Sequence, residues 1–424
     1  MHQVGCSAQQ AVQAPSQPCN PSRTPVTTFS RIDPRRPRRI RVDSQHVQSM
    51  RDLEPALAEP SFGACARPAA AALLRTQYSD LVQSWPTPAQ LPLVYHKRYN
   101  ISFFGIEKLH PFDSCKFQKV VAALEAAGCL QGGGKQLVQP LEASQAVLSD
   151  LHTPAYLNLL HTTNLKVVQV TELPPLLLLP PALVQWKVMA PMRLHVGGTM
   201  LATALAVERG WAINLGGGMH HAYYSNGMGW CPYDDITLAI RRVRAASQGK
   251  IQKVLYIDLD AHQGNGIGRD KLHFKDSDLF ILDMYNGRVF PQDDTARPAI
   301  NIDVQLTSGV ADAEYLKSLE GALSQATQRF PRPDLVFYNA GTDILEGDPL
   351  GRMKVTRDGV LARDAMVWSY ALKEARAPIV MTLSGGYARS SAAVVSESIV
   401  NLMRRFKLLQ DPPGFGSEST GPGS

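Results

Sequence analysis

The sequence has few cysteines and lacks a long apolar run. Its six cysteines are scattered over 424 residues without a Cys-x-x-Cys pair, so neither a disulfide framework nor a cysteine-ligated zinc site is indicated. The most apolar stretch, residues 173–184, contains four prolines and is shorter than the roughly 20 residues that cross a bilayer. We expect an intracellular protein with no transmembrane segment, in which this stretch forms a buried loop leading into a helix.

Acidic residues are nearly absent from the start of the chain. Residues 1–42 contain seven arginines and one acid, Asp33. This segment accounts for the whole formal net charge of +6, and the rest of the chain is neutral. Because a nucleic-acid-binding domain carries its own basic face, we expect no direct nucleic-acid binding by the body of the protein.

The composition of residues 1–90 differs from that of the rest. This segment is rich in Ser, Thr, Gln, Ala, Pro and Arg, which predicts a disordered N-terminal extension. An Arg-rich, acid-poor leader favours a transit peptide, and hence a plastid or mitochondrion. Residues 35–39 alternatively fit a nuclear localisation patch, which would place the protein in the nucleus or cytoplasm. Residues 409–424, rich in Pro, Gly and Ser, predict a flexible tail.

Between these ends, short apolar runs alternate with longer periodic stretches, which indicates buried parallel strands and helices. The expected strands are residues 211–215, 254–259, 279–282, 335–338 and 379–383. The expected helices are residues 116–127, 199–209, 236–246, 312–329, 358–375 and 392–406. This order predicts an α/β fold with a single central, mostly parallel sheet flanked by helices on both faces. Sites in such sheets form at the carboxyl ends of the strands.

Metal-ligand side chains follow two of the predicted strands. Asp258, Asp260 and His262 share one face if the chain is extended there, and two carboxylates with one imidazole are typical of an oxygen/nitrogen metal site. Asp343 follows a second strand. With Asp260 and His262 it would make three protein ligands and leave one position open, as in catalytic zinc sites. The alternatives are a solvated acidic turn and, for Asp343, a turn or helix cap.

Two further strand ends carry groups suited to acid–base chemistry. Three glycines and Met219 lead into His220 and His221, and histidine is the side chain most easily tuned near neutral pH. Tyr387 follows Ser-Gly-Gly after the last predicted strand, and its phenol suits a developing oxyanion. The alternatives are that the histidines are metal ligands or lie by chance in a flexible loop, and that the tyrosine is a packing residue. Together, the four motifs predict one site.

The combination of motifs resembles the zinc-dependent histone deacetylase family. The resemblance rests on residues 216–221 (Gly-Gly-Gly-Met-His-His), 258–262 (Asp-Leu-Asp-Ala-His), 339–343 (Asn-Ala-Gly-Thr-Asp), 347–351 (Gly-Asp-Pro-Leu-Gly) and 384–387 (Ser-Gly-Gly-Tyr). Residues 110–113, 194–214 and 262–266 are similar to its class IV branch. The resemblance covers residues 92–406. It implies the arginase/deacetylase fold, with residues 91–408 as the catalytic domain.

The resemblance implies one Zn²⁺ per chain, bound by Asp260, His262 and Asp343. In the family this ion polarises the acyl carbonyl and activates a water, although Fe²⁺ or Co²⁺ suits the same ligands. The metal-bearing strand and Asp283 fall where the family often holds a structural K⁺ ion. Binuclear manganese chemistry of the arginase type is disfavoured, because Gly264 and Gly341 stand where its second metal needs carboxylates.

The resemblance also implies the catalytic groups. His220 and His221 would handle the water proton and the leaving amine, Tyr387 would donate a hydrogen bond to the oxyanion, and Asp258 would orient His220. Class I members have an aspartate near the second histidine, where this chain has Asn265. An amide orients His221 without stabilising its imidazolium. His221 should therefore protonate less readily than beside a carboxylate.

Three residues are implied to bind the substrate. Gly229 and Trp230 match one wall of the family's acyl-lysine tunnel, and Phe290 is a candidate for the opposite wall. Flat aromatic faces suit the aliphatic stem of an acyl-lysine, while core packing is the alternative explanation for both aromatic residues.

The implied reaction is hydrolysis of the amide bond of an acylated lysine in histones or other proteins, with an acetyl or a long-chain acyl group. Acetyl-polyamines or other small amides are alternative substrates, because the chemistry is the same and only the tunnel rim differs. A catalytically silent acyl-lysine-binding scaffold is a further alternative. The sequence leaves the oligomeric state open.

Overall fold

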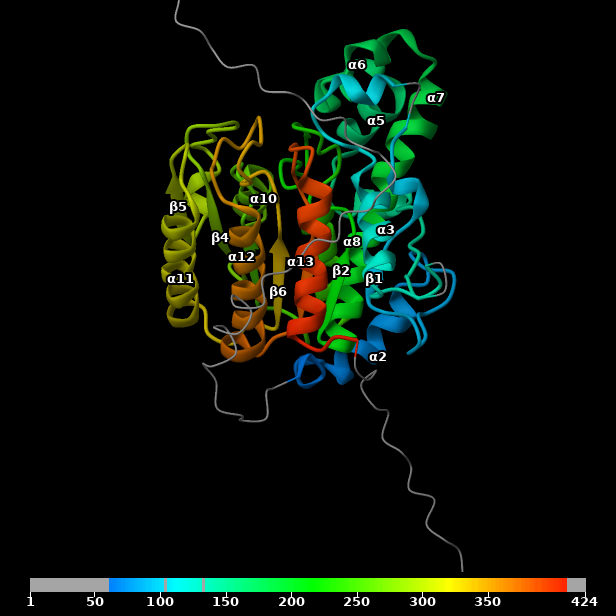
Figure 1. Cartoon of the computed structure of the whole chain (residues 1–424). Coiled ribbons are helices and arrows are strands. Elements are labelled where there is room, and N and C mark those ends of the chain that lie inside the picture. Colours follow the sequence, from blue (N-terminus) through cyan, green and yellow to red (C-terminus); the bar gives the residue numbers. More distant parts are fainter. Residues whose placement is uncertain (1–60, 103–104, 132–133, 410–424) are drawn as a thin grey trace, which may run out of the picture. The chain divides into compact units, whose positions relative to one another are not determined.

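The computed structural model describes residues 61–102, 105–131 and 134–409. The predicted localisation signals in residues 1–42 and nearly all of the predicted tail lie outside these residues. At the centre of the described part is one sheet of seven parallel strands, in the order β1–β2–β7–β6–β3–β4–β5 (Figure 1). The strands are β1 (Leu93–Val94), β2 (Trp211–Asn214), β3 (Val254–Asp258), β4 (Leu279–Asn286), β5 (Ile302–Leu306), β6 (Leu335–Asn339) and β7 (Ile379–Thr382).

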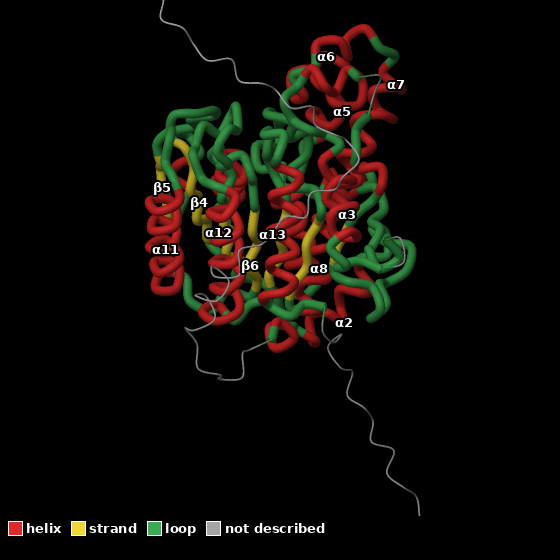
Figure 2. The backbone as a smooth tube through the Cα atoms, viewed as in Figure 1, coloured by secondary structure: helices red, strands yellow, loops and turns green. Residues whose placement is uncertain are grey.

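Helices cover both faces of this sheet, which confirms the predicted fold class (Figure 2). The helices are α2 (Pro68–Gln77), α3 (Lys116–Ala126), α4 (Gln145–Ser149), α5 (Pro154–Thr162), α6 (Asn164–Thr171), α7 (Pro181–Val184), α8 (Ala190–Arg209), α9 (Asp235–Ala246), α10 (Asn265–Phe274), α11 (Asp312–Arg329), α12 (Arg357–Tyr370) and α13 (Ser391–Arg405).

Each face of the sheet has its own hydrophobic core because successive strand residues point to opposite sides. On β3, Val254 and Tyr256 pack into the core formed with α2, α8 and α9. Leu255 and Ile257 pack into the core formed with α3, α11, α12 and α13. The strands are therefore buried on both faces, as their continuous apolar runs predicted.

The structure differs from the expected elements at several places, and α4, α5, α6 and α10 were not predicted. β1 was not predicted because two residues give no periodic signal, and β5 was not predicted because only two of the five residues of this edge strand are buried. Helix α8 begins at Ala190 rather than at Thr199. Its Gly197 and Gly198 do not end a helix but allow close packing, since a Cβ at Gly198 would lie 1.7 Å from the Tyr99 hydroxyl.

The predicted extent of the N-terminal extension was wrong for residues 61–90. These residues form α2 and turns around it, and Leu74, Tyr78 and Leu81 are fully buried in the core shared with α8 and α9. A Cβ at Gly210 would lie 1.7 Å from the Phe62 carbonyl oxygen, so this segment also packs against the end of α8. The polar, Pro-rich composition concealed a short helix that buries only a few apolar side chains.

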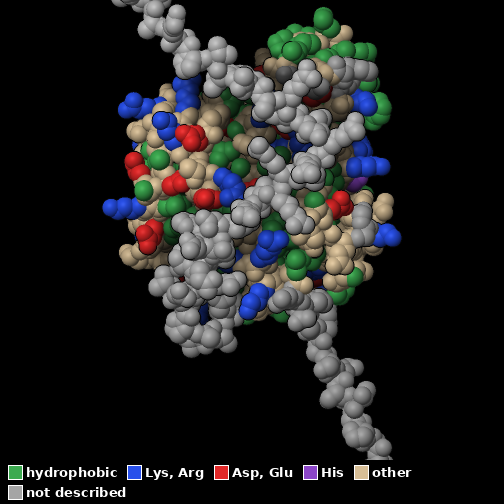
Figure 3. Space-filling model, viewed as in Figure 1, with side chains coloured by type: hydrophobic (Ala, Val, Ile, Leu, Met, Phe, Trp, Pro, Cys, Tyr) green, Lys and Arg blue, Asp and Glu red, His purple; other side chains and the backbone are tan. Residues whose placement is uncertain are grey.

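The apolar stretch at residues 173–184 was predicted as a buried loop leading into a helix. It does lead into α7, but its first part is a 3₁₀ turn, Pro174–Leu178, that is only partly buried. Leu178 is 89% exposed, and Leu177 and Trp186 are also exposed. Figure 3 shows hydrophobic side chains gathered over this part, near α5 to α7. Among the described residues, no helix combines the length and apolar character needed to cross a membrane.

Substitution of a buried residue in α2 tests whether residues 61–90 belong to the folded unit. Leu74 is 0% exposed, so Leu74→Ala is expected to lower the free energy of unfolding by about 2–5 kcal/mol. Ala72, which is exposed on the same helix, provides the control: Ala72→Ser should change it by no more than about 0.5 kcal/mol. Urea denaturation measures both. Equal values for the Leu74→Ala variant and the wild type would contradict the packing.

Candidate active site

The four motifs follow four strands that are neighbours in the sheet: β2, β7, β6 and β3. The ends of these strands are level, because Asn214 pairs with Thr382, Thr382 with Asn339, and Asn339 with Asp258. The chain therefore leaves all four strands at one edge of the sheet. This register brings together side chains that are far apart in the sequence.

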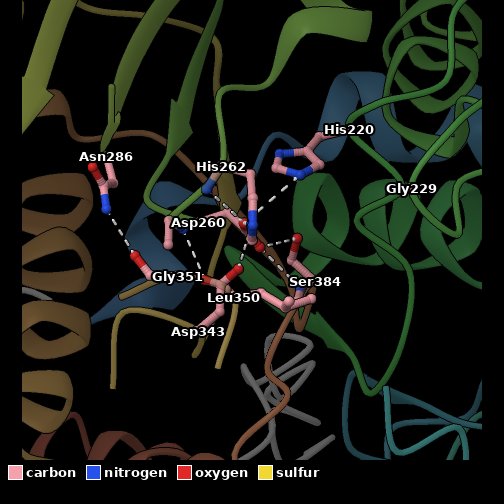
Figure 4. A network of polar contacts seen from close by, with 12 residues as sticks. His220, Gly229, Asp260, His262, Asn286, Asp343, Leu350, Gly351 and Ser384 are labelled. Carbon is pink, nitrogen blue, oxygen red and sulfur yellow. Dashed lines mark hydrogen bonds and ion pairs between the residues drawn. The ribbon is translucent and has the colours of Figure 1, made fainter. Parts of the chain in front are cut away.

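The three predicted metal ligands meet at this edge. One ligand atom from each of Asp260, His262 and Asp343 lies within 4.8 Å of the others, and all three residues are buried. The Nδ1 atom of His262 lies 3.1 Å from Oδ1 of Asp260 and 2.8 Å from Oδ2 of Asp343. Figure 4 shows the three side chains pointing toward one another.

Backbone and hydroxyl donors orient the two carboxylates. The Ala261 amide donates to Oδ1 of Asp343 at 2.8 Å, and the Gly385 amide donates to Oδ2 of Asp260 at 3.0 Å. The Ser384 hydroxyl donates to the same Asp260 oxygen at 3.0 Å. A Cβ at Gly385 would lie 2.6 Å from that oxygen, so the loop approaches this closely because the residue is glycine.

The charge of this group fits a cation. Two carboxylates face one imidazole inside the protein, so the group has net negative charge where solvent screens little. Burial lowers the pKa of His262, but Asp260 and Asp343 outweigh burial and raise it to about 10. The field that holds a proton on His262 would equally attract a divalent ion, and one imidazole with two carboxylates is a donor set suited to zinc.

His220 is held beside a carboxylate. Its Nδ1 lies 2.8 Å from Oδ2 of Asp258, an oxygen that also accepts a hydrogen bond from the Tyr256 hydroxyl at 2.5 Å. Burial lowers the pKa of His220, but the charges of Asp258 and Asp260 outweigh burial and raise it to about 9. His220 therefore carries a proton at neutral pH.

His221 is held beside an amide instead. Its Nδ1 lies 2.8 Å from Oδ1 of Asn265. The Asn265 Nδ2 donates to Oδ2 of Asp293 at 3.0 Å, which fixes the amide orientation because a carboxylate can only accept. Nδ1 of His221 is then the donor, and its Nε2 is free to accept a proton. Burial, together with the nearby His220 and His262, holds the pKa of His221 well below its usual range.

Tyr387 is positioned through its backbone. The Asp348 carboxylate accepts hydrogen bonds from the amides of Tyr387 at 2.7 Å and Ala388 at 2.9 Å. The Tyr387 ring centroid is 6.1 Å from that of His262. Burial and the nearby Asp260 and Asp343 hold the pKa of Tyr387 well above its usual range, so the phenol keeps its proton and can donate it in a hydrogen bond.

A pocket with an empty volume of about 590 Å³ opens onto these groups. Its lining includes Gly229, Trp230, both histidines, Asp260 and Tyr387, and it continues to Tyr99, Ile101, Phe117 and Met192. Among the described residues, the predicted site residues His262, Asp343 and Phe290 are outside this lining. Phe290 lies near Gly229, where a Cβ would be 3.4 Å from its Cε1. It is 47% exposed, and its ring meets that of His221 at 5.1 Å in an edge-on arrangement.

Sequence reasoning missed three residues that support the site. Lys116 is buried, and its Nζ donates to the carbonyls of Ser384 at 2.6 Å and Gly385 at 3.0 Å. The Asp235 carboxylate accepts hydrogen bonds from the amides of Gly218 and Met219, just before the histidines. Arg363 is fully buried behind the metal-ligand loops. No spacing rule marks them, because each acts on a loop distant in the sequence.

Comparisons with known proteins agree with this arrangement. Residues 110–403 match the histone deacetylase domain family. Histone deacetylase 2 of Arabidopsis thaliana is 45% identical over 353 residues, which cover 83% of this chain and 88% of that protein. An uncharacterized protein of Picosynechococcus sp. is 33% identical over 307 residues, 70% of this chain and 93% of that protein.

The crystal structure of the HDA15 HD domain matches with a TM-score of 0.59 at 21% identity, over 75% of this chain and 91% of that chain. This likeness confirms the arginase/deacetylase fold. The family match spans more than half of the chain, and the relatives named above align over most of their own length. The chain therefore belongs to the histone deacetylase family.

Proposed function

We propose that this protein hydrolyses the amide bond of an Nε-acyl-lysine in histones or other proteins, in the manner of the class IV branch. The observation that carries the proposal is the convergence of the ligand set Asp260, His262 and Asp343 with a pocket that is lined by Asp260, two histidines with opposite pKa shifts and a protonated tyrosine. Since the side chains that the proposed hydrolysis needs lie close together, a catalytically silent scaffold is the poorer account.

The two histidines divide the proton transfers between them. His221 is neutral, and its Nε2 is free to accept a proton from the attacking water. His220 carries a proton at neutral pH, so it stabilises developing negative charge and supplies a proton for the leaving lysine amine. The pKa of His220 is raised despite its burial, because the Asp258 carboxylate stands beside it. Burial, His220 and His262 lower the pKa of His221, whose partner Asn265 adds no negative charge.

The remaining groups hold the acyl carbonyl. The Tyr387 phenol, which keeps its proton, donates a hydrogen bond to the carbonyl oxygen as negative charge develops there. A zinc ion held by Asp260, His262 and Asp343 would supply Lewis-acid polarisation of that carbonyl and lower the pKa of the water. Gly229 lies against the His221 ring, where a Cβ would be 2.8 Å from Cδ2, and so leaves room for the lysine stem.

A structural K⁺ ion also fits the residues behind His220. Asp258 and Asp283 face each other in the register of β3 and β4. The Oδ1 atom of Asp283 is buried and has no hydrogen-bond partner among the described residues. Burial, and then the Asp258 charge, hold the pKa of Asp283 well above its usual range. We propose that a monovalent cation neutralises this pair.

Hydrolysis of a peptide panel tests the proposed function. Lysine peptides with acyl chains from acetyl to myristoyl, together with acetyl-polyamines, are offered to the zinc-loaded protein. We expect turnover of at least one acyl-lysine peptide, and a loss of about 10²–10³ in kcat for Tyr387→Phe, since one oxyanion donor is removed. Turnover of polyamines alone would make the substrate a small amide. Turnover of no compound would refute the proposed enzymatic function.

The amide beside His221 predicts a specific pH dependence. A carboxylate at this place favours the imidazolium, so Asn265→Asp should raise the pKa of His221 by about 1–3 units. Because neutral His221 is the active form, the acidic limb of the pH profile of kcat/KM should move to higher pH. The double variant Asn265→Asp/Asp293→Asn avoids repulsion with Asp293, which lies 3.0 Å from the Asn265 amide, and Asp293→Asn alone is the control. Superimposable profiles for all four proteins would contradict this role.

A further inference from the structure

A buried arginine connects the two loops that carry the metal ligands. Arg363 on α12 is fully buried. Its Nη1 donates to the carbonyl of Leu259 at 3.2 Å and to that of Gly341, and its Nη2 donates to the carbonyl of Ala340 at 3.5 Å. One guanidinium thus binds carbonyls from the loops after both β3 and β6.

These carbonyls lie where the pairing of the two strands ends. β3 and β6 pair up to Asp258 and Asn339, and the Leu259 amide still donates to the Asn339 carbonyl at 3.1 Å. Beyond this point the loops run to the ligands Asp260 and Asp343, one and two residues after the carbonyls that Nη1 binds. Beyond the end of the strand pairing, the guanidinium of Arg363 holds the two loops together in place of the hydrogen bonds of the sheet.

The guanidinium is itself anchored to the rest of the fold. Its Nε donates to Oδ1 of Asp364 at 2.8 Å, so the buried charge is paired. The Tyr338 hydroxyl on β6 donates to the same oxygen at 2.5 Å, and the Ser398 hydroxyl on α13 donates to Oδ2. A planar fork with several N–H donors bridges separated carbonyls in a way that a lysine ammonium, a compact point charge, does not.

The loops have little room to move relative to each other. A Cβ at Gly341 would lie 2.1 Å from Oδ2 of Asp260, so the β6 loop touches the ligand from the β3 loop. A shift of the loop after β3 or of the loop after β6 would therefore change the distance between the carboxylates of Asp260 and Asp343. We propose that Arg363 is a positioning residue that sets the separation of Asp260 and Asp343, and thereby the affinity for the metal. This inference rests on the metal site of the proposed function.

Two variants separate the shape of Arg363 from its charge. Arg363→Lys keeps a positive charge beside Asp364 but loses the planar fork. The double variant Arg363→Met/Asp364→Asn removes both charges, so no unpaired carboxylate is left buried. The dissociation constant for Zn²⁺ is measured by competition with a chromophoric chelator. We expect zinc to bind about 10–100-fold more weakly to both variants, the range typical of residues that orient metal ligands.

A second buried arginine provides the matched control. Arg209 donates to the carbonyls of Pro86 and Thr87 at 3.0 Å and to that of Gln90, so it too bridges loop carbonyls. It lies just before β2, at the amino end of the sheet, away from the metal ligands. Arg209→Met should lower the free energy of unfolding, measured on the metal-free protein, while zinc affinity stays within about twofold of the wild type.

The outcomes distinguish this inference from the function on which it rests. A wild-type protein that binds no zinc would refute the proposed metal site and this inference with it. Wild-type binding with unchanged affinity in a folded Arg363 variant would refute the role of Arg363 alone. Equal loss in Arg209→Met would assign the effect to general destabilisation and would also refute it. If neither Arg363 variant folds, Asp364→Asn is measured instead, because this variant keeps a hydrogen-bond acceptor beside Arg363. The inference then stands only if Asp364→Asn weakens zinc binding, by a factor smaller than the change of about 10–100-fold expected for the Arg363 variants.

Discussion

The structure depends on one electrostatic constraint: Asp260 and Asp343 are brought together around His262 inside the protein. Two buried carboxylates whose oxygens lie within 4.8 Å of each other repel unless protons, hydrogen-bond donors or a cation compensate their charge. The surrounding residues supply that compensation from every side. Backbone amides, the Ser384 hydroxyl and, farther back, the buried Lys116 all direct positive charge or donors toward the loops of this group. The parallel sheet makes the arrangement possible, because its strands end level at one edge.

The same edge gives two adjacent histidines different properties. His220 and His221 are neighbours in the sequence, and their ring centroids are 4.1 Å apart. The carboxylate of Asp258 raises the pKa of His220 despite burial. Burial and the nearby His220 and His262 lower the pKa of His221, whose partner is an amide. The neutrality of His221 has a cause on each side of the ring. It follows from burial beside two other histidines and from a partner, Asn265, that holds the ring without adding charge.

Much of the fold and the site could be predicted from the sequence, because both depend on local patterns. Buried parallel strands are continuous apolar runs, and polar residues directly after them must lie at one edge of the sheet. For this reason Asp258, Asp260, His262 and Asp343 could be assigned together from their positions after the predicted strands. The family resemblance added the roles of the histidines and Tyr387, and the structure places these residues around one pocket.

The rest could not be predicted, because it depends on contacts between distant segments. Lys116 and Arg363 are charged residues in amphipathic helices, where solvent exposure is the ordinary expectation, yet both are buried and bind loop carbonyls. The helix α2 buries few apolar residues, so its composition resembles that of a disordered segment. The role of Phe290 stays a prediction, because its ring packs edge-on against His221 and lies near Gly229 but is outside the lining of the pocket.

The most direct test of the central claim is anomalous X-ray diffraction from zinc-loaded crystals at the zinc absorption edge. The account predicts one strong peak per chain, about 2.0–2.2 Å from a carboxylate oxygen of Asp260, from Nδ1 of His262 and from a carboxylate oxygen of Asp343. A peak elsewhere, or ligand atoms too far apart to share one ion, would contradict it.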